Sequence, residues 1–179
     1  FDFSSMKSKK VTGLNVILKN IEKAKSDENI KGIYLDVSTI PAGIATIEEI
    51  RNALIDFKSS KKFIVSYSEA YSQKAYYLSS VADQIYVHPE GGLDFRGLSA
   101  QLMFLKGTLE KLEIEPEIIR HGKYKSAIEP LIYDKMSIEN REQTTTYITS
   151  IWNHLVNGIS TARNISVIDI NNIADKALV

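Results

Sequence analysis

Cysteine is absent from the 179 residues of the chain. Thiol catalysis, cysteine-ligated zinc, iron–sulfur clusters and disulfide bonds are therefore excluded. An excess of either charge is also missing, because 22 Lys and Arg balance 22 Asp and Glu. A protein that binds nucleic acid without sequence preference needs surplus cations to displace counterions, so we do not expect a nucleic-acid partner.

Long hydrophobic runs and an initiator methionine are missing as well. The sequence has no stretch of about 18 apolar residues, so no segment of it is expected to span a membrane. It begins with FDF and lacks the apolar core of a signal peptide. We therefore expect the sequence to be a piece excised from a longer protein.

The sequence does have the composition of a folded domain. Hydrophobic residues make up 44% of the chain and charged residues 25%. At this length folding buries roughly 70% of the surface that the unfolded chain exposes. Because no internal repeat, low-complexity tract or linker interrupts the sequence, we predict a single domain over residues 1–179.

Apolar residues at helical spacing alternate with short runs of β-branched and aromatic residues. Helices are predicted over 12–26, 46–57, 72–81, 102–112, 137–163 and 167–177, and strands over 33–37, 63–68, 85–88, 93–97 and 117–121. Thr46 and Glu49 are interpreted as a capping box and residues 89–92 as a turn. Strands that alternate with helices indicate an α/β fold, a mostly parallel sheet with flanking helices.

Motifs for common cofactors and catalytic centres are absent. The sequence contains no GxGxxG, GxxxxGK[ST] or GxSxG pattern. Its histidines, His88, His121 and His154, lie far apart, so each is interpreted as a structural or surface residue. We therefore expect neither a cofactor nor a metal.

The stretch that offers most for chemistry is HGKYKSAIEP at residues 121–130. One interpretation is a solvated basic loop, and the other is a loop that carries a catalytic lysine. A lysine acts as a general base only when it is neutral, so burial must lower its pKa from about 10.4 to about 7 or 8. Of the two lysines, Lys125 has the less charged immediate neighbours.

A neutral lysine can activate a serine, as in the Ser–Lys variant of serine hydrolases. Ser126 adjoins Lys125, but neighbours in an extended chain point in opposite directions. Ser126 is therefore better placed to orient the lysine than to attack a substrate. We expect the nucleophile to come from elsewhere.

These residues resemble the signal peptide peptidase A family, also called protease IV, which comprises bacterial Ser–Lys peptidases with a Clp-protease/crotonase-like fold. The most specific part of the resemblance is GKYKSAIEP at residues 122–130. Supporting blocks lie at residues 31–36, 71–78, 82–86 and 134–137. The resemblance covers nearly the whole chain and corresponds to the amino-terminal repeat of the long, two-repeat form.

The resemblance implies that Lys125 is the general base. In the long form the nucleophilic serine lies in the carboxy-terminal repeat, and Gln73 stands at the corresponding position here. Ser72 is one position away, which turns a side chain by about 100° at a helix start, so we interpret it as an N-cap. The loop at residues 41–44 retains a single glycine where the catalytic repeat has its oxyanion loop, so a working oxyanion hole is not expected.

The resemblance also implies supporting residues and partners. Tyr124, Ser126 and Glu129 would support the lysine, with Glu129 as a loop or interface anchor. The substrates would be signal-peptide remnants and other extended hydrophobic peptides. The partners would be the carboxy-terminal repeat and identical subunits in a ring or dome, held on the periplasmic side of the bacterial cytoplasmic membrane by a segment absent from this chain.

Two alternatives stay open. One is a catalytically silent assembly repeat of the same peptidase, in which the lysine loop stabilises a subunit interface. The other is a crotonase-like acyl-CoA enzyme. Thioester chemistry in such an enzyme needs a pair of backbone amides, and the single glycine in the loop at residues 41–44 disfavours this arrangement. If Lys125 acts on a serine of the carboxy-terminal repeat, the catalytic pair is divided between two repeats. The isolated chain is then expected to show little or no peptidase activity.

Overall fold

The computed structural model of the chain describes residues 12–119, 122 and 125–176. The chain divides into two compact units. The first is Phe1–Arg96 with Gly158–Val179, and the second is Gly97–Asn157. The single domain expected over residues 1–179 stays a prediction.

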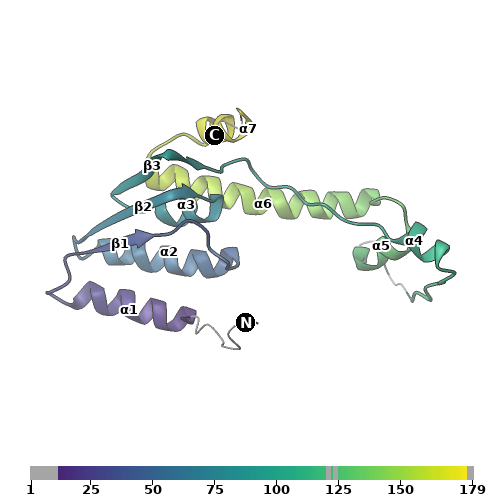
Figure 1. Cartoon of the computed structure of the whole chain (residues 1–179), viewed down its shortest axis with the longest axis horizontal. Coiled ribbons are helices and arrows are strands. Elements are labelled where there is room, and N and C mark those ends of the chain that lie inside the picture. Colours follow the sequence, from purple (N-terminus) through teal and green to yellow (C-terminus); the bar gives the residue numbers. More distant parts are fainter. Residues whose placement is uncertain (1–11, 120–121, 123–124, 177–179) are drawn as a thin grey trace. The chain divides into compact units, whose positions relative to one another are not determined.

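A three-stranded parallel sheet in the order β1-β2-β3 forms the centre of the first unit (Figure 1). Its strands are β1 (Gly32–Asp36), β2 (Phe63–Tyr71) and β3 (Gln84–Leu93). Gly32 pairs with Phe63 at one junction, and Val65 pairs with Gln84 at the other. The predicted parallel sheet is thereby confirmed.

Helices connect and flank these strands. The first unit contains α1 (Leu14–Ser26), α2 (Ile44–Lys58), α3 (Gln73–Ser79), α7 (Val167–Lys176) and the carboxyl end of α6 (Ile138–Arg163). Helix α1 packs on α2, and α3 packs on α2, β2 and β3. Buried side chains from these elements form the core: Ile47, Leu54, Phe57, Ile64, Ala75 and Tyr77. The predicted α/β class with flanking helices is confirmed.

Strand β3 departs from the sequence prediction, because it runs through the turn expected at residues 89–92. The separate strand expected over 93–97 is also wrong, since β3 itself ends at Leu93. A β-bulge accommodates the longer pairing, with a register shift between Ser68 and Ala70. A Cβ at Gly91 would lie 1.7 Å from the carbonyl oxygen of Glu69, so the close approach of the strands requires glycine there.

The starts of two helices test the predicted caps. Helix α2 begins at Ile44 after Gly43, which makes no side-chain cap bond, so the capping box assigned to Thr46 and Glu49 is wrong. At α3 the predicted N-cap is confirmed, because the Ser72 hydroxyl accepts a hydrogen bond from the Ala75 amide at 3.3 Å.

The second unit contains short helices and most of α6. These are α4 (Lys106–Lys111), the 3₁₀ turn η1 (Ser126–Ile128) and α5 (Glu129–Ile132). Helix α4 is shorter than the helix predicted over 102–112. The strand predicted over 117–121 is not formed at 117–119, and its last two residues lie outside the described part. Across the described residues, none of the helices has both the length and the apolar character of a membrane span.

Candidate active site

Lys125 immediately precedes η1 in the second unit, and its side chain is exposed. General-base catalysis by lysine requires a desolvated amine. The described residues of this chain do not bury the side chain. His121, Lys123 and Tyr124 lie outside the described residues, so the supporting role expected of Tyr124 stays a prediction.

The segment after Lys125 turns sharply into α5. The Glu129 amide donates to the Ser126 carbonyl, and Pro130 occupies the start of α5, where a missing amide hydrogen is tolerated. The Ser126 hydroxyl donates to Oε1 of Gln143 on α6 at 3.5 Å. That bond attaches the lysine segment to α6, and the predicted orienting role of Ser126 toward Lys125 stays a prediction.

Glu129 is fully buried and joins α5 to the start of α6. Its carboxylate accepts hydrogen bonds from the Ser137 amide at 3.1 Å, the Ser137 hydroxyl at 2.6 Å and the Asn140 side-chain amide at 2.8 Å. The Ser137 hydroxyl in turn accepts from the Asn140 backbone amide at 3.1 Å, which caps α6. These contacts fit the anchor role expected of Glu129.

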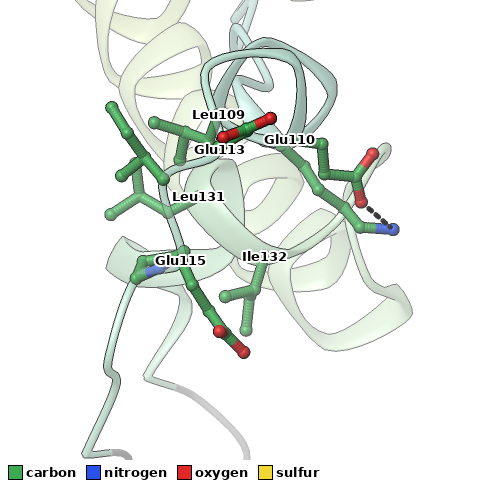
Figure 2. A pocket seen from close by; sticks show the side chains of 9 residues that line it. Leu109, Glu110, Glu113, Glu115, Leu131 and Ile132 are labelled. Atoms are coloured by element: carbon green, nitrogen blue, oxygen red, sulfur yellow. Dashed lines mark ion pairs between the residues drawn. The ribbon is translucent and has the colours of Figure 1, made fainter.

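A cavity of about 500 Å³ lies against α5 (Figure 2). Leu109, Leu131 and Ile132 provide apolar lining, and Glu113 and Glu115 add carboxylates. Leu131 and Ile132 belong to α5, the helix that follows Lys125. Two residues of the cavity lining therefore follow the candidate base closely in the sequence.

Lys106 is the basic residue in the wall of this cavity. Its ammonium group lies 3.3 Å from Asp134 and 3.6 Å from Glu110. The hydrogen bond to Asp134, together with both carboxylate charges, raises the pKa of Lys106 above its ordinary value. Lys106 is thus held as a cation in an ion-pair network.

The residues at the position of a nucleophile and an oxyanion loop lie in the first unit. The Ser72 hydroxyl caps α3, and the Gln73 side-chain oxygen accepts from the Arg96 amide at 3.3 Å. In the loop before α2, the Ala42 carbonyl accepts from the Lys74 ammonium group at 2.8 Å. These contacts fit structural roles for both Ser72 and Gln73.

Metal-binding clusters of three or more His, Cys, Asp or Glu do not occur among the described residues. Nδ1 of His88 accepts from the Glu90 amide at 3.1 Å, a local contact within β3. Ser137 and Asn140 were not predicted as partners of Glu129. Their spacing, a serine three residues before an asparagine, indicates a helix start, but it does not join either residue to Glu129.

The parallel sheet, its helices and the lysine segment define an α/β protein of the predicted Clp-protease/crotonase-like class. Residues 56–179 match the family model described as Peptidase family S49. The chain belongs to peptidase family S49, which confirms the predicted family.

Curated relatives resemble nearly the whole chain. Protease 4 of Haemophilus influenzae is 36% identical over 158 residues, 88% of this chain and 26% of the relative. Serine protease SPPA, chloroplastic, of Arabidopsis thaliana is 34% identical over 175 residues, 97% of this chain and 26% of the relative. Protease 4 of Salmonella typhi is 37% identical over 151 residues, 84% of this chain and 24% of the relative. The chain thus spans about a quarter of the length of these relatives.

Proposed function

We propose that this chain is the amino-terminal repeat of a longer serine endopeptidase, in which Lys125 is the general base. The observation that carries the proposal is the match to peptidase family S49 over residues 56–179, a range that includes the lysine segment. The name of the Arabidopsis relative, a serine protease, supports the reaction type.

The proposed reaction divides the catalytic pair between two repeats. Neutral Nζ of Lys125 takes the proton from a serine hydroxyl of the carboxy-terminal repeat while the serine oxygen attacks a peptide carbonyl. The lysine returns that proton to the leaving amine, and an acyl-enzyme remains. Water then attacks the ester carbonyl, with the lysine again accepting a proton, and the serine is regenerated.

Exposure of Lys125 supports the divided site. A general-base lysine must be desolvated, and within the described chain its side chain lies in solvent. Another segment or subunit must therefore cover it in the active protein. Ser72 and Gln73 are engaged in contacts within the first unit, which supports an external source for the serine.

The expected surroundings of the enzyme belong to the same proposal. The substrates are signal-peptide remnants and other extended hydrophobic peptides. The partners are the carboxy-terminal repeat and identical subunits in a ring or dome, on the periplasmic side of the bacterial cytoplasmic membrane. No cofactor is required, because lysine and serine supply the proton transfer and the nucleophile.

Lys125→Ala in the full-length protein tests the proposal. Loss of a general base lowers the rate by about 10²-fold to 10⁴-fold, so peptide hydrolysis should fall by at least this much. Lys135→Ala, at an exposed lysine of the same unit, is the matched control and should retain activity. Retained activity in Lys125→Ala would exclude the general-base role.

Two further measurements separate the alternatives. For a silent assembly repeat, Lys125→Ala should change the oligomer size in analytical ultracentrifugation more than it changes turnover. For an acyl-CoA enzyme, titration with CoA should show binding, and none is expected. Robust hydrolysis by the isolated chain, abolished by Ser72→Ala, would overturn the divided site.

A further inference from the structure

Glu129 is a buried carboxylate for which the proposed reaction has no chemical task. It lies four residues after Lys125, and its exposed fraction is 0%. Removing a carboxylate from water is unfavourable unless hydrogen bonds replace the lost hydration. A buried carboxylate therefore needs hydrogen-bond donors around it, and the elements that supply these donors indicate what the carboxylate does.

The donors come from a segment eight to eleven residues further along the chain. They are the backbone amide and hydroxyl of Ser137, at 3.1 and 2.6 Å, and the side-chain amide of Asn140, at 2.8 Å. All three lie at the amino-terminal end of α6, where the helix dipole also favours a negative charge. Glu129 therefore attaches its own helix, α5, to the start of a 26-residue helix.

The connection from Glu129 back to Lys125 is short and hydrogen-bonded. The three residues between them form η1, whose Ser126 carbonyl accepts from the Glu129 amide. On the other side, the Tyr133 amide donates to the Glu129 carbonyl at 2.9 Å. The backbone of Lys125 is thus one 3₁₀ turn away from an anchored residue.

Direct participation of Glu129 in proton transfer conflicts with this geometry. Both carboxylate oxygens accept hydrogen bonds, Oε1 from the Ser137 hydroxyl and Oε2 from the Ser137 and Asn140 amides. The side chain has no exposed surface through which a substrate could reach it. Its contribution must act through the backbone that it holds.

We propose that Glu129 is a positioning residue: by binding Ser137 and Asn140 at the start of α6, it fixes the turn that presents Lys125 to the reacting serine. The inference rests on the proposed function, because it assumes that Lys125 is the general base. It goes further by identifying the group that sets the position of that base.

The donor set explains why a carboxylate is needed. Each of these three groups donates a hydrogen, and the Ser137 hydroxyl, which accepts from the Asn140 backbone amide, uses its single hydrogen toward Glu129. In Glu129→Gln, the amide group of glutamine would place its own hydrogens against one of these donors. One buried donor would then lose its acceptor, and the turn would move.

The experiment uses the full-length enzyme and steady-state hydrolysis of a hydrophobic peptide. Glu129→Gln should lower kcat by about 10-fold to 100-fold with KM changed less than about twofold, because a displaced base slows the chemical step and leaves substrate binding intact. Ser137→Ala removes one donor and should show a smaller loss of kcat. Ser137→Thr keeps the hydroxyl and should restore most of it.

Controls separate positioning from general loss of structure. Glu142→Gln alters an exposed glutamate on α6 and should leave kcat unchanged. Thermal unfolding of every variant gives the folded fraction, and the loss of kcat should exceed the loss of folded protein. If Glu129→Gln does not fold, the comparison of Ser137→Ala with Ser137→Thr carries the test.

Two results would overturn the proposal. Wild-type kcat in folded Glu129→Gln, or a loss that merely follows the unfolded fraction, would reduce Glu129 to a structural residue. Lys125→Ala is measured in parallel to distinguish failure of the general-base role of Lys125 from failure of the positioning role of Glu129. An active Lys125→Ala would overturn both the general base and its positioning, whereas an inactive one beside a fully active Glu129→Gln would overturn the positioning alone.

Discussion

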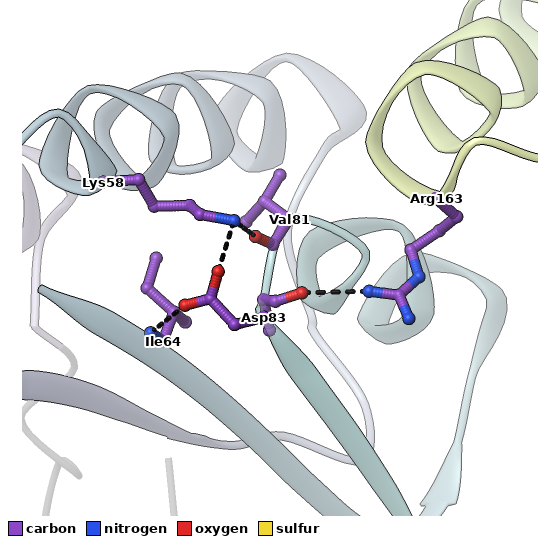
Figure 3. Close-up of polar contacts among 6 residues, drawn as sticks. Lys58, Ile64, Val81, Asp83 and Arg163 are labelled. Carbon is purple, nitrogen blue, oxygen red and sulfur yellow. Dashed lines mark hydrogen bonds and ion pairs between the residues drawn. The ribbon is translucent and has the colours of Figure 1, made fainter. Parts of the chain in front are cut away.

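Asp83 and Ile64 exchange two hydrogen bonds. The Ile64 amide donates to Oδ2 of Asp83 at 2.8 Å (Figure 3). The Asp83 amide in turn donates to the Ile64 carbonyl at 2.8 Å. Lys58, the last residue of α2, adds an ion pair to Oδ1 of the same carboxylate at 2.7 Å. The side chain of Asp83, the residue before β3, therefore contacts both the end of α2 and the start of β2.

Asp83→Asn should reduce the free energy of unfolding by about 1 to 2 kcal/mol, because it removes the ion pair and weakens a charge-assisted bond to the Ile64 amide. Urea unfolding of the chain measures this change. The matched control is Asp56→Asn, which breaks an ion pair to Lys25 at a carboxylate whose side chain is 66% exposed. That control should cost less than about 1 kcal/mol, and equal losses in both variants would contradict the assignment.

The same carboxylate should make stability depend on pH in the acid range. Burial alone would raise the pKa of Asp83, but the hydrogen bonds from Lys58 and the Ile64 amide outweigh it and lower the pKa below its ordinary value. A lowered folded-state pKa stabilises the fold above the unfolded pKa of about 3.9, and this contribution disappears as the pH falls through the folded value. Since the Asp83 side chain is 39% exposed, solvent screening limits its size.

Urea unfolding between about pH 6 and pH 2.5 should therefore show a steeper acid loss of stability in the wild type than in Asp83→Asn. Other carboxylates contribute to both proteins alike, so the difference between the two curves isolates Asp83. Parallel curves would mean that the Asp83 pKa is the same in the folded and unfolded states.

Gly91→Ala should destabilise the sheet by about 2 to 4 kcal/mol, because the added Cβ would lie 1.7 Å from the Glu69 carbonyl oxygen and the strands must separate. Gly107→Ala is the matched control, since nothing lies within 4 Å of a Cβ at this helical position. It should be neutral or stabilise the chain by up to about 1 kcal/mol. Chemical unfolding of both variants measures the contrast, and similar effects would show that β2 and β3 do not approach closely at Gly91.

Sequence periodicity predicted the fold class well, because the strands and long helices depend on patterns that repeat over many residues. Helix α6, supported by apolar residues at helical spacing in its carboxyl-terminal half, was predicted within one residue of its observed start. Local signals were less reliable. The glycines and proline at 89–92 indicated a turn, but a bulge and the long-range pairing of β3 with β2 keep this segment extended.

The candidate site was predictable only in part. The lysine segment stood out by composition and by family resemblance, whereas the burial of Glu129 depends on Ser137 and Asn140, which no local pattern joins to it. Exposure of Lys125 was also beyond the sequence, since its residue type and neighbours are compatible with either state. Burial is a property of the packed chain, so it required the structure.

Ser72→Ala distinguishes a helix cap from a nucleophile. The hydroxyl accepts from the Ala75 amide at 3.3 Å, so its removal should cost about 1 kcal/mol of stability, measured by chemical unfolding. Ser72→Asn is the matched control, because its side-chain oxygen can cap the same amide and should preserve stability. In the full-length enzyme both variants should hydrolyse peptide at the wild-type rate once the folded fraction is taken into account. Loss of hydrolysis in both, with stability retained in Ser72→Asn, would instead identify Ser72 as the attacking group, since the two variants share only the missing hydroxyl.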